Sequence, residues 1–415
     1  MNRACRQLAQ EWTELGHGHF EKSDYVHADR AYRKAAALDP MYAPAANAVG
    51  AVSLRLESYP DALAWLERSI ALDPQLAAAW SNLAATHFTL HQYPRARAAS
   101  HRALALAPND LNALMNLAST HGAAGRITDA CEVYERIAET HPQSASALSN
   151  LIFQRDLLDT DPAEAHRLRR LWYDRFGRPL ASLITPHTNR RDPHKRLRVG
   201  YVSSDLRLHS AIFVLTPVLR GHSSDVEAFI YATHDPNRAD GATAQLRADA
   251  HVAVWRDCTT HTDAQVAEQV RRDGIDILVD CNGHSAGSRL RVFAMQPAPV
   301  QVTAWGYAHG TGIPQIQWMF GDPIAIPVEQ RAHFTEFIWD LPCIVPYAPP
   351  SPCPEPSSAP YATLGAFTFG SMNRIDKISD TCWDAWAEIL HATPGTRFLI
   401  KAGSLTRGAL VESVY

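Results

Sequence analysis

The chain has 415 residues, of which 46% are hydrophobic, and this is enough for two or three domains with cores of their own. Its formal net charge of -4 excludes a basic field over the whole chain that would attract nucleic acid or an anionic membrane. The first residues lack the apolar segment of a signal peptide, and no stretch approaches the roughly 18 apolar residues that span a bilayer. We therefore expect a cytoplasmic protein with neither a nucleic-acid nor a membrane partner.

Seven cysteines are scattered along the sequence. None of them shows the C-x-x-C spacing of a zinc knuckle, and their positions do not suggest a disulfide framework. Disulfides persist mainly in oxidising compartments. The cysteines are therefore expected to be reduced thiols.

A repeat of 34 residues organises the first part of the chain, and it is marked by Pro40, Pro74, Pro108 and Pro142. A small residue recurs in the same register, where the two helices of a unit must approach closely: Ala28, Ala62, Ala96 and Ala130. This is the tetratricopeptide pattern, with units at about 9–42, 43–76, 77–110 and 111–144 and a degenerate fifth. Because one such unit cannot bury its own apolar face, neighbours stack into an α-solenoid with a concave groove for polypeptides. We assign residues 1–178 to this domain.

Asparagine also follows the repeat, at Asn82, Asn116 and Asn150, in the middle of first helices where its propensity is poor. One interpretation is a ladder of amides on the concave side that binds the backbone of an extended peptide. The other is that these amides tie adjacent helices together or face water. Ala48 interrupts the series in the second unit.

Residues 179–196 form a linker that contains most of a local basic run, completed by Arg198. We interpret this run as a solvated connector in preference to a binding patch. Short apolar segments then alternate with helical patterns, which indicates an α/β domain over residues 197–341. The predicted strands are 197–202, 226–232, 252–255, 275–280 and 299–305. Such units wind into a Rossmann-like parallel sheet that binds ligands beyond the carboxyl ends of its strands.

A proline-rich linker over residues 342–360 precedes a second α/β segment, 361–415. It contains a strand, a helix from Asp380 to His391 and a second strand. A nucleotide-binding half of this kind needs about five or six strands. This half is therefore expected to be incomplete, as in a truncated chain.

Four motifs stand in order along the α/β part: RVGYVSSDLRLHS, DGIDILVDCNGHSAGSRL, PAPVQVTAWGYAHGTG and FGSMNRIDK. Together with the repeats they resemble the SPINDLY / O-GlcNAc transferase family. The resemblance implies two Rossmann-like GT-B halves and inverting transfer of a sugar to Ser or Thr of polypeptides held by the repeats. It implies UDP-GlcNAc as the donor substrate and no cofactor.

The same resemblance suggests the site residues. His209, in the loop after the first strand, matches the active-site histidine of the family and is expected to act as a base or to position the acceptor. Lys377 matches the lysine that neutralises the leaving diphosphate, and Asn373 and Arg374 flank it, although relatives commonly have a neutral amide where Arg374 stands. The remaining residues that the resemblance places around the sugar and the acceptor are Asn282, Gly283, His284, Ser285, Gly306 and Tyr307. Ala308 and His309 depart from the usual GYPGTTG pattern.

Metal binding was weighed at one D-x-D match, Asp159, Thr160 and Asp161. Asp161 precedes Pro162 and Glu164, which is the signature of a helix N-terminus. We therefore predict no metal in the site and a metal-independent enzyme.

Two functions of different classes remain open. One is a protein O-glycosyltransferase, whose incomplete donor half can leave the chain inactive. The other is a tetratricopeptide interaction scaffold with a remnant catalytic region. A transferase that uses another sugar nucleotide, such as a fucose or glucose donor, is a third alternative.

Overall fold

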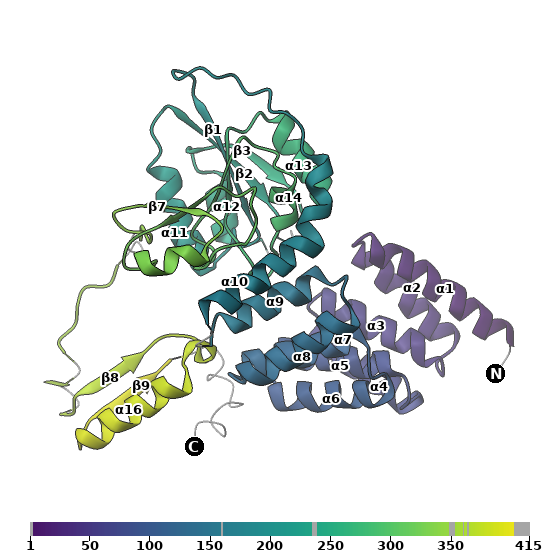
Figure 1. Ribbon diagram of the computed structural model, residues 1–415. Coiled ribbons are helices and arrows are strands. Elements are labelled where there is room, and N and C mark those ends of the chain that lie inside the picture. The colour runs from purple at the N-terminus through teal and green to yellow at the C-terminus, as the bar shows by residue number, and fades with distance from the viewer. Residues whose placement is uncertain are drawn as a thin grey trace. The chain divides into compact units, whose positions relative to one another are not determined.

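The computed structural model describes residues 3–158, 161–234, 239–347, 353–359, 361–362 and 365–401 (Figure 1). The chain divides into two compact units. The first comprises Met1–Ser144 and Ser358–Tyr415, and the second comprises Ala145–Ser357. The two units are described one after the other.

The first unit begins with helices in antiparallel pairs, as a tetratricopeptide solenoid requires. Their bounds are α1 Arg3–Glu21, α2 Tyr25–Leu38, α3 Ala43–Arg55, α4 Tyr59–Leu72, α5 Ala77–Thr89, α6 Tyr93–Leu106, α7 Leu111–Ala123 and α8 Ile127–Thr140. The four alanines of the repeat register are fully buried, which confirms the close approach expected there. A Cβ added to Gly16 would lie 2.4 Å from the Tyr32 ring, and one added to Gly50 would lie 2.5 Å from Leu66. The small residues of the repeat are therefore required by packing between paired helices.

The C-terminal segment of the first unit has the predicted strand, helix and strand. Strands β8 Thr368–Ser371 and β9 Arg397–Ile400 pair in parallel, and α16 Asp380–Ala392 connects them. The Trp386 and Phe398 rings lie 4.7 Å apart, so α16 packs on β9. A short 3-10 turn, η5 Ile375–Lys377, follows β8, and its buried Ile375 packs with Tyr93 of α6.

The second unit is built on seven parallel strands in the order β3-β2-β1-β4-β5-β6-β7. Their bounds are β1 Leu197–Ser203, β2 Val226–Ala232, β3 Val252–Asp257, β4 Ile277–Asp280, β5 Val300–Thr303, β6 Trp318–Gly321 and β7 Phe337–Asp340. The first five confirm the prediction. The other two were not predicted, and Phe337 of the edge strand β7 is 71% exposed.

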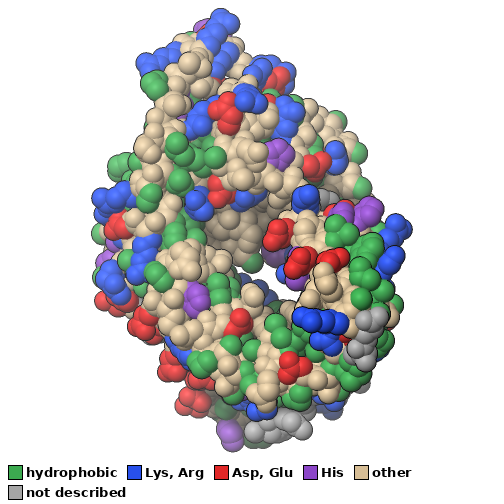
Figure 2. Space-filling view, turned by 90° about the vertical axis from the view of Figure 1, so that its right-hand side faces the viewer, with side chains coloured by type: hydrophobic (Ala, Val, Ile, Leu, Met, Phe, Trp, Pro, Cys, Tyr) green, Lys and Arg blue, Asp and Glu red, His purple; other side chains and the backbone are tan. Residues whose placement is uncertain are grey.

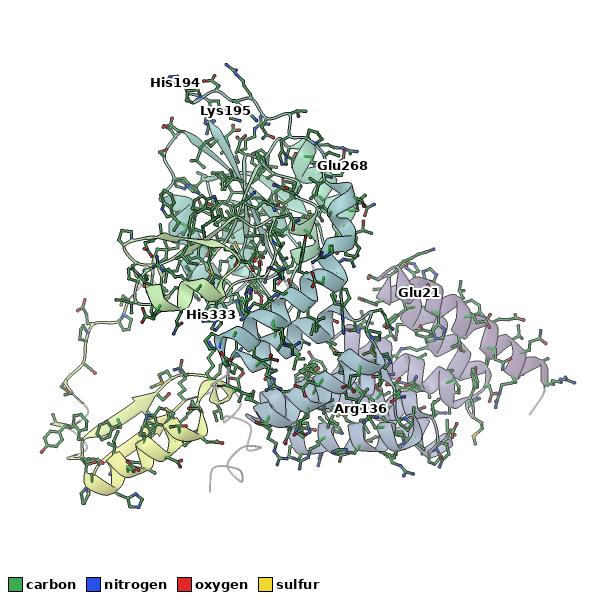
Figure 3. The ribbon with its side chains drawn as sticks, viewed as in Figure 1. Glu21, Arg136, His194, Lys195, Glu268 and His333 are labelled. Carbon is green, nitrogen blue, oxygen red and sulfur yellow. The ribbon has the colours of Figure 1, made fainter. Side chains whose placement is uncertain are left out.

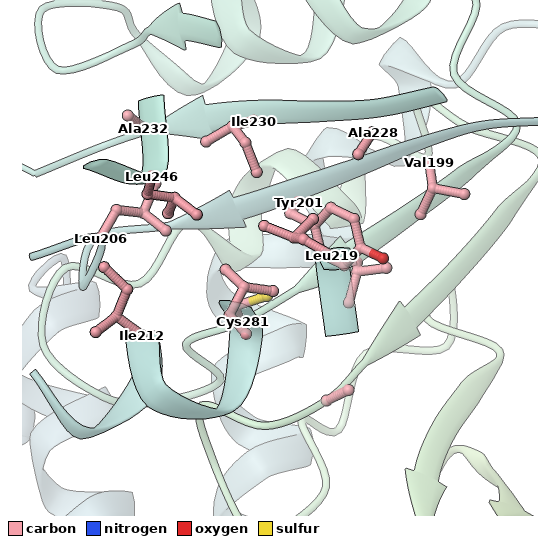
Figure 4. Packing of buried hydrophobic residues seen from close by; sticks show 13 residues of the cluster. Val199, Tyr201, Leu206, Ile212, Leu219, Ala228, Ile230, Ala232, Leu246 and Cys281 are labelled. Carbon is pink, nitrogen blue, oxygen red and sulfur yellow. The ribbon is translucent and has the colours of Figure 1, made fainter. Parts of the chain in front are cut away.

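Helices cover both faces of this sheet. Helices α11 Ser210–Arg220 and α12 Gly241–Arg247 pack on the face that carries Val199, Tyr201 and Ile230 (Figure 4). The opposite face meets α13 Asp263–Arg272, where the Tyr231 hydroxyl donates a 2.8 Å hydrogen bond to Asp273. Because strand side chains alternate between faces, nearly every residue in the middle of β1 and β2 is buried.

The remaining elements of this unit surround the sheet. They are α9 Ala145–Arg155, α10 Pro162–Trp172, the π-turn η1 Tyr173–Gly177, the 3-10 turns η2 Arg178–Leu183 and η4 Val328–His333, and α14 Leu290–Ala294. Helices α9 and α10 are the predicted fifth repeat, and they belong to the same compact unit as the sheet. The domain boundary expected at residue 178 stays a prediction.

The basic run lies at the amino ends of the strands, where Figure 3 labels His194 and Lys195 and Figure 2 shows Lys and Arg side chains gathered at the top. Lys195 pairs with Asp276, and Arg196 and Arg198 both pair with Glu227. These carboxylates offset much of the charge, which favours the connector interpretation. The run is also at the opposite edge of the sheet from the candidate site.

Candidate active site at the carboxyl edge of the sheet

His209 stands in the open loop after β1, immediately before α11. Its Nδ1 accepts a 3.3 Å hydrogen bond from the Ala211 amide and so caps that helix. The same nitrogen lies 3.9 Å from Asp205 Oδ1, and 41% of the side chain is exposed. Because Nδ1 is used as an acceptor, we infer that the neutral ring carries its proton on Nε2.

Asn282, after β4, fastens this loop to the CNGHS loop. Its Oδ1 accepts from the Ser204 amide at 2.9 Å, and its Nδ2 donates to Ser204 Oγ at 2.8 Å and to Asp205 Oδ2 at 3.0 Å. The two loops meet because β1 and β4 are parallel neighbours, whose carboxyl ends share one edge. Asn282 itself is only 2% exposed, so its amide holds the loops together. Ser285, on the same loop, is half-buried.

Asp280 is a buried carboxylate that the sequence analysis missed. It accepts hydrogen bonds from the amides of Asn282 and Gly283 at 3.2 and 2.9 Å, and from Thr303 Oγ1 at 2.9 Å. Burial raises the pKa of Asp280 to about 6, although these hydrogen bonds oppose the shift. The aspartate at the end of the strand fixes the backbone of the loop that follows it.

His284 was expected to line the sugar and acceptor pocket, and its burial contradicts that expectation. The side chain is 0% exposed. Its Nε2 donates to the Thr311 carbonyl at 2.8 Å, and its Nδ1 lies 3.3 Å from Ser149 Oγ of α9. Burial lowers the pKa of His284 to about 3, so the ring is neutral. His284 therefore joins α9 to the sheet and does not face a substrate.

The GYAHG loop after β5 packs closely against the CNGHS loop. A Cβ on Gly306 would lie 1.6 Å from the Cys281 carbonyl oxygen, so only glycine fits there. Gly283 has φ +54, and a Cβ on it would lie 2.5 Å from Tyr307 Cβ. Tyr307 is 9% exposed, and its hydroxyl donates to Asp156. These three residues therefore pack beneath the site, and little of them is available to contact a ligand.

Asp156 and Arg169 form a buried ion pair between α9 and α10, with 2.5 Å between Arg169 Nη2 and Asp156 Oδ1. Each side chain is 6% exposed. Burial raises the pKa of Asp156 even though the Arg169 charge opposes the shift. Together with Tyr307 and His284, this pair connects the hairpin formed by α9 and α10 to the sheet.

A cavity of about 100 Å³ opens beside this ion pair, lined by Asp156, Arg169, His309 and His333 among others. Ligand pockets usually measure about 300–1,000 Å³. The cavity is therefore too small for a nucleotide sugar. His309, one of the two departures from the family pattern, lines this cavity. Its ring lies next to the Tyr307 ring, with 5.8 Å between the ring centroids.

Comparison with known proteins identifies the two parts of the chain. Residues 182–343 match the family described as Glycosyl transferase family 41, and residues 13–77 and 82–145 match tetratricopeptide repeats. This part of the chain is similar to glycosyl transferase family 41. The SPINDLY protein of Arabidopsis thaliana, named as a probable UDP-N-acetylglucosamine--peptide N-acetylglucosaminyltransferase, is 34% identical over 248 residues. That match covers 59% of this chain and 26% of the relative.

Two further proteins support the assignment. The SEC protein of Arabidopsis thaliana, named in the same way, is 29% identical over 49% of this chain and 21% of its own length. A solved structure of the O-GlcNAc transferase of Thermobaculum terrenum has a TM-score of 0.74 at 29% identity, covering 100% of this chain and 72% of that chain. The fold is thus helical repeats followed by a parallel sheet like that of a GT-B half. This chain spans about a quarter of the length of the curated relatives it matches.

The remaining residues suggested by the family 41 resemblance, Asn373, Arg374 and Lys377, belong to the first compact unit. All three are exposed. Arg374 pairs with Asp376 through two hydrogen bonds of 3.1 and 2.7 Å. The Arg374 guanidinium is thus paired with Asp376 of the same turn, whereas Lys377 is exposed at the surface next to it.

Two asparagines of the 34-residue series form hydrogen bonds with the preceding repeat. Asn82 Nδ2 donates to Asn47 Oδ1, and Asn116 Nδ2 donates to the Ser81 carbonyl, both at 2.9 Å. These bonds agree with the interpretation that the amides tie adjacent helices together. Asn82, Asn116 and Asn150 are all half-buried, and a contact with peptide stays a prediction.

The D-x-D match contributes a helix cap. Asp161 Oδ1 accepts from the Ala163 amide at 3.0 Å at the start of α10, as predicted, while Asp159 and Thr160 lie outside the described residues. All seven cysteines are free thiols. Within the described ranges, none of the helices combines the length and apolar character needed to cross a bilayer.

Proposed function

We propose that this chain is a protein O-glycosyltransferase that transfers N-acetylglucosamine from UDP-N-acetylglucosamine to Ser or Thr of polypeptides. The family 41 match over residues 182–343 and the likeness to an O-GlcNAc transferase of known structure support this. The tetratricopeptide repeats would hold the acceptor polypeptide or a partner protein. We further propose that the protein acts in the cytoplasm.

His209 carries the proposal. Its side chain is 41% exposed at the carboxyl edge of the sheet, where open α/β folds bind ligands. The hydrogen bond from the Ala211 amide leaves Nε2 as the proton-bearing atom, directed away from the helix cap. We therefore propose that Nε2 donates a hydrogen bond to the acceptor hydroxyl and positions it. The base role would require the other tautomer, with the Nδ1 proton toward Asp205.

The proposed step is an inverting displacement without a metal. The acceptor oxygen forms a bond to the anomeric carbon while the bond from that carbon to the diphosphate oxygen breaks. The hydroxyl proton leaves with the departing diphosphate, which becomes more basic as the bond breaks. The ammonium of Lys377 is proposed to neutralise this charge, and removing one such group typically costs about 3 kcal/mol or more. His209 and Lys377 thus have separate roles.

A titration with UDP and a transfer assay with radiolabelled donor test the proposal on the full chain. Micromolar UDP binding and labelling of Ser or Thr in a polypeptide acceptor would support it. No binding at millimolar UDP would favour an interaction scaffold with a remnant catalytic region. Labelling from a fucose or glucose nucleotide, but not from UDP-N-acetylglucosamine, would favour the alternative donors.

A further inference from the structure

The turn between α1 and α2 brings two imidazoles and one carboxylate together, far in sequence from the transferase motifs. His19 Nδ1 lies 3.0 Å from Asp24 Oδ2, and His27 Nδ1 lies 2.8 Å from Asp24 Oδ1. The ligand atoms of all three residues lie within 4.8 Å of one another. Glu21, labelled in Figure 3, is the last residue of α1 and marks this end of the helix pair.

The two nitrogen-to-oxygen distances are close to those of a zinc site. Four ligand atoms about 2.0–2.1 Å from a tetrahedral ion are about 3.3 Å apart. These two distances need to lengthen by only a few tenths of an ångström. The imidazoles present the same ring atom, Nδ1, to the two oxygens of one carboxylate, and a small side-chain adjustment brings the ligand atoms from within 4.8 Å to tetrahedral spacing. The side chains are 34, 39 and 58% exposed, so water can complete the coordination.

The turn holds the three residues in place through its backbone. The Asp24 amide donates to the His19 carbonyl at 3.0 Å, and the His27 amide donates to Asp24 Oδ1 at 3.4 Å. The His19 and His27 rings are stacked, with centroids 5.3 Å apart. Little ordering would therefore be needed when an ion binds.

The other repeats show what an ordinary histidine does at this position. His87 and His121 stand in the register of His19. His87 Nδ1 is hydrogen-bonded to Gln92 at 2.7 Å, and His121 Nδ1 lies 3.4 Å from Asp129 Oδ2, in both cases at the start of the second helix. A contact between the two helices of a repeat thus accounts for a histidine at the position of His19. It does not explain the second imidazole, His27, on the same carboxylate, because the corresponding positions in those two repeats are Arg95 and Asp129. The first repeat alone combines two imidazoles with a shared carboxylate in this register.

We propose that His19, Asp24 and His27 bind one Zn²⁺, with water in the fourth position. Imidazole and carboxylate are typical zinc ligands, and three protein ligands with an open position are a familiar zinc arrangement. The ion would tie the end of α1 to the start of α2 and stabilise the first repeat. This site is separate from the proposed transfer reaction.

Calorimetric titration of the full chain with Zn²⁺, after dialysis against a chelator, tests the proposal. We expect one ion per chain and a rise in Tm on adding zinc. Asp24→Asn should lower the affinity at least about 100-fold, because loss even of a residue that only supports a ligand commonly costs 10–100-fold. This variant keeps a good helix cap, since Asn caps helices about as well as Asp.

His27→Ala is the second test, because this side chain is 58% exposed and its removal should leave the fold intact. It should lose the same affinity and the zinc-dependent rise in Tm. His101→Ala removes an exposed histidine from the same solenoid and should bind zinc like the parent chain. Absence of binding by the parent, or unchanged affinity in both Asp24→Asn and His27→Ala, would overturn the proposal.

Discussion

Two histidines of the family motifs stand at the same edge of one sheet and differ in almost every physical respect. His209 is 41% exposed and begins a helix, whereas His284 is fully buried and joins α9 to the loop after β5. A ring that contacts a substrate must be reachable, and a ring that joins two elements must not exchange partners with water. At this edge an exposed histidine is therefore supported by a cluster of buried, hydrogen-bonded side chains, which we call the joint.

The joint is made of polar side chains. Asp280, His284, Tyr307, Asp156 and Arg169 are all buried and bonded to partners in other loops or helices. Buried polar groups that keep their partners fix one geometry, and groups that lose a partner become costly. We expect substitutions in the joint to lower stability and substitution of His209 to lower activity.

The largest expected effect is that of His209→Ala on transfer. Losing a positioned acid, base or hydrogen-bond donor typically costs about 10²–10⁴-fold in rate. The free energy of unfolding should fall by only about 0.5–2 kcal/mol, because the substitution removes one helix cap from a side chain that is 41% exposed. Steady-state transfer of radiolabelled sugar and urea denaturation on the same samples measure both quantities.

His251→Ala is the matched control for this experiment. His251 is also exposed, and it pairs with Asp249 at 2.8 Å away from the motif loops. It should retain full transfer. Equal rates for His209→Ala and the parent chain would remove His209 from the site, and a large loss of stability would place it in the joint instead.

Arg169→Ala should give the largest loss of stability. Removing one partner of a buried ion pair typically costs about 3–5 kcal/mol, because Asp156 would remain buried without its cation. Arg272→Ala, at a pair whose arginine is 70% exposed, should change the free energy of unfolding by less than about 1 kcal/mol. If urea denaturation gave the two variants similar values, the ion pair would not hold the hairpin on the sheet.

His284→Gln should change how stability depends on pH. The folded-state pKa of His284 is lowered to about 3 from 6.5, so the unfolded chain takes up this proton first on acidification. Its contribution is therefore fully present above pH 6.5 and is lost as the pH falls toward 3, by up to about 1.4 kcal/mol per pH unit. Asp280 acts in the opposite sense between about pH 4 and 6, because its folded-state pKa is raised to about 6.

Since Asp280 is present in both chains, the difference between parent and His284→Gln isolates the histidine. We expect the variant to be about 1–3 kcal/mol less stable at pH 7.5, because Ser149 loses its partner. The gap should narrow on acidification. Ser149→Ala retains the imidazole and should retain the pH dependence, and a constant gap between parent and His284→Gln would contradict the buried, neutral ring.

The sequence predicted the elements whose signal is local. The 34-residue register located the helix pairs. Five of the seven strands followed from apolar runs. Strands β6 and β7 were missed because their apolar runs, residues 318–320 and 337–339, have only three residues each.

The site was predicted less completely, because the roles of its residues depend on distant partners. Nothing near His284 in the sequence reveals that Ser149, 135 residues earlier, lies against its ring. Asp280 was read as the last residue of a strand, and its three donors became apparent only in the folded loop. Residue type and motif located the edge of the sheet, but burial decided which residues face outward.

Asn116→Ala should have the smallest effect, and it tests the same distinction in the solenoid. The substitution removes the hydrogen bond to the Ser81 carbonyl, worth about 1 kcal/mol, but alanine also favours the helix by up to about 0.7 kcal/mol. Asn112→Ala, at an exposed position of the same helix, measures the propensity gain alone. The difference between the two variants in urea denaturation should therefore be about 1 kcal/mol. No difference would show that the amide does not tie the repeats together, and weaker binding of an acceptor peptide to Asn116→Ala alone would support the peptide ladder.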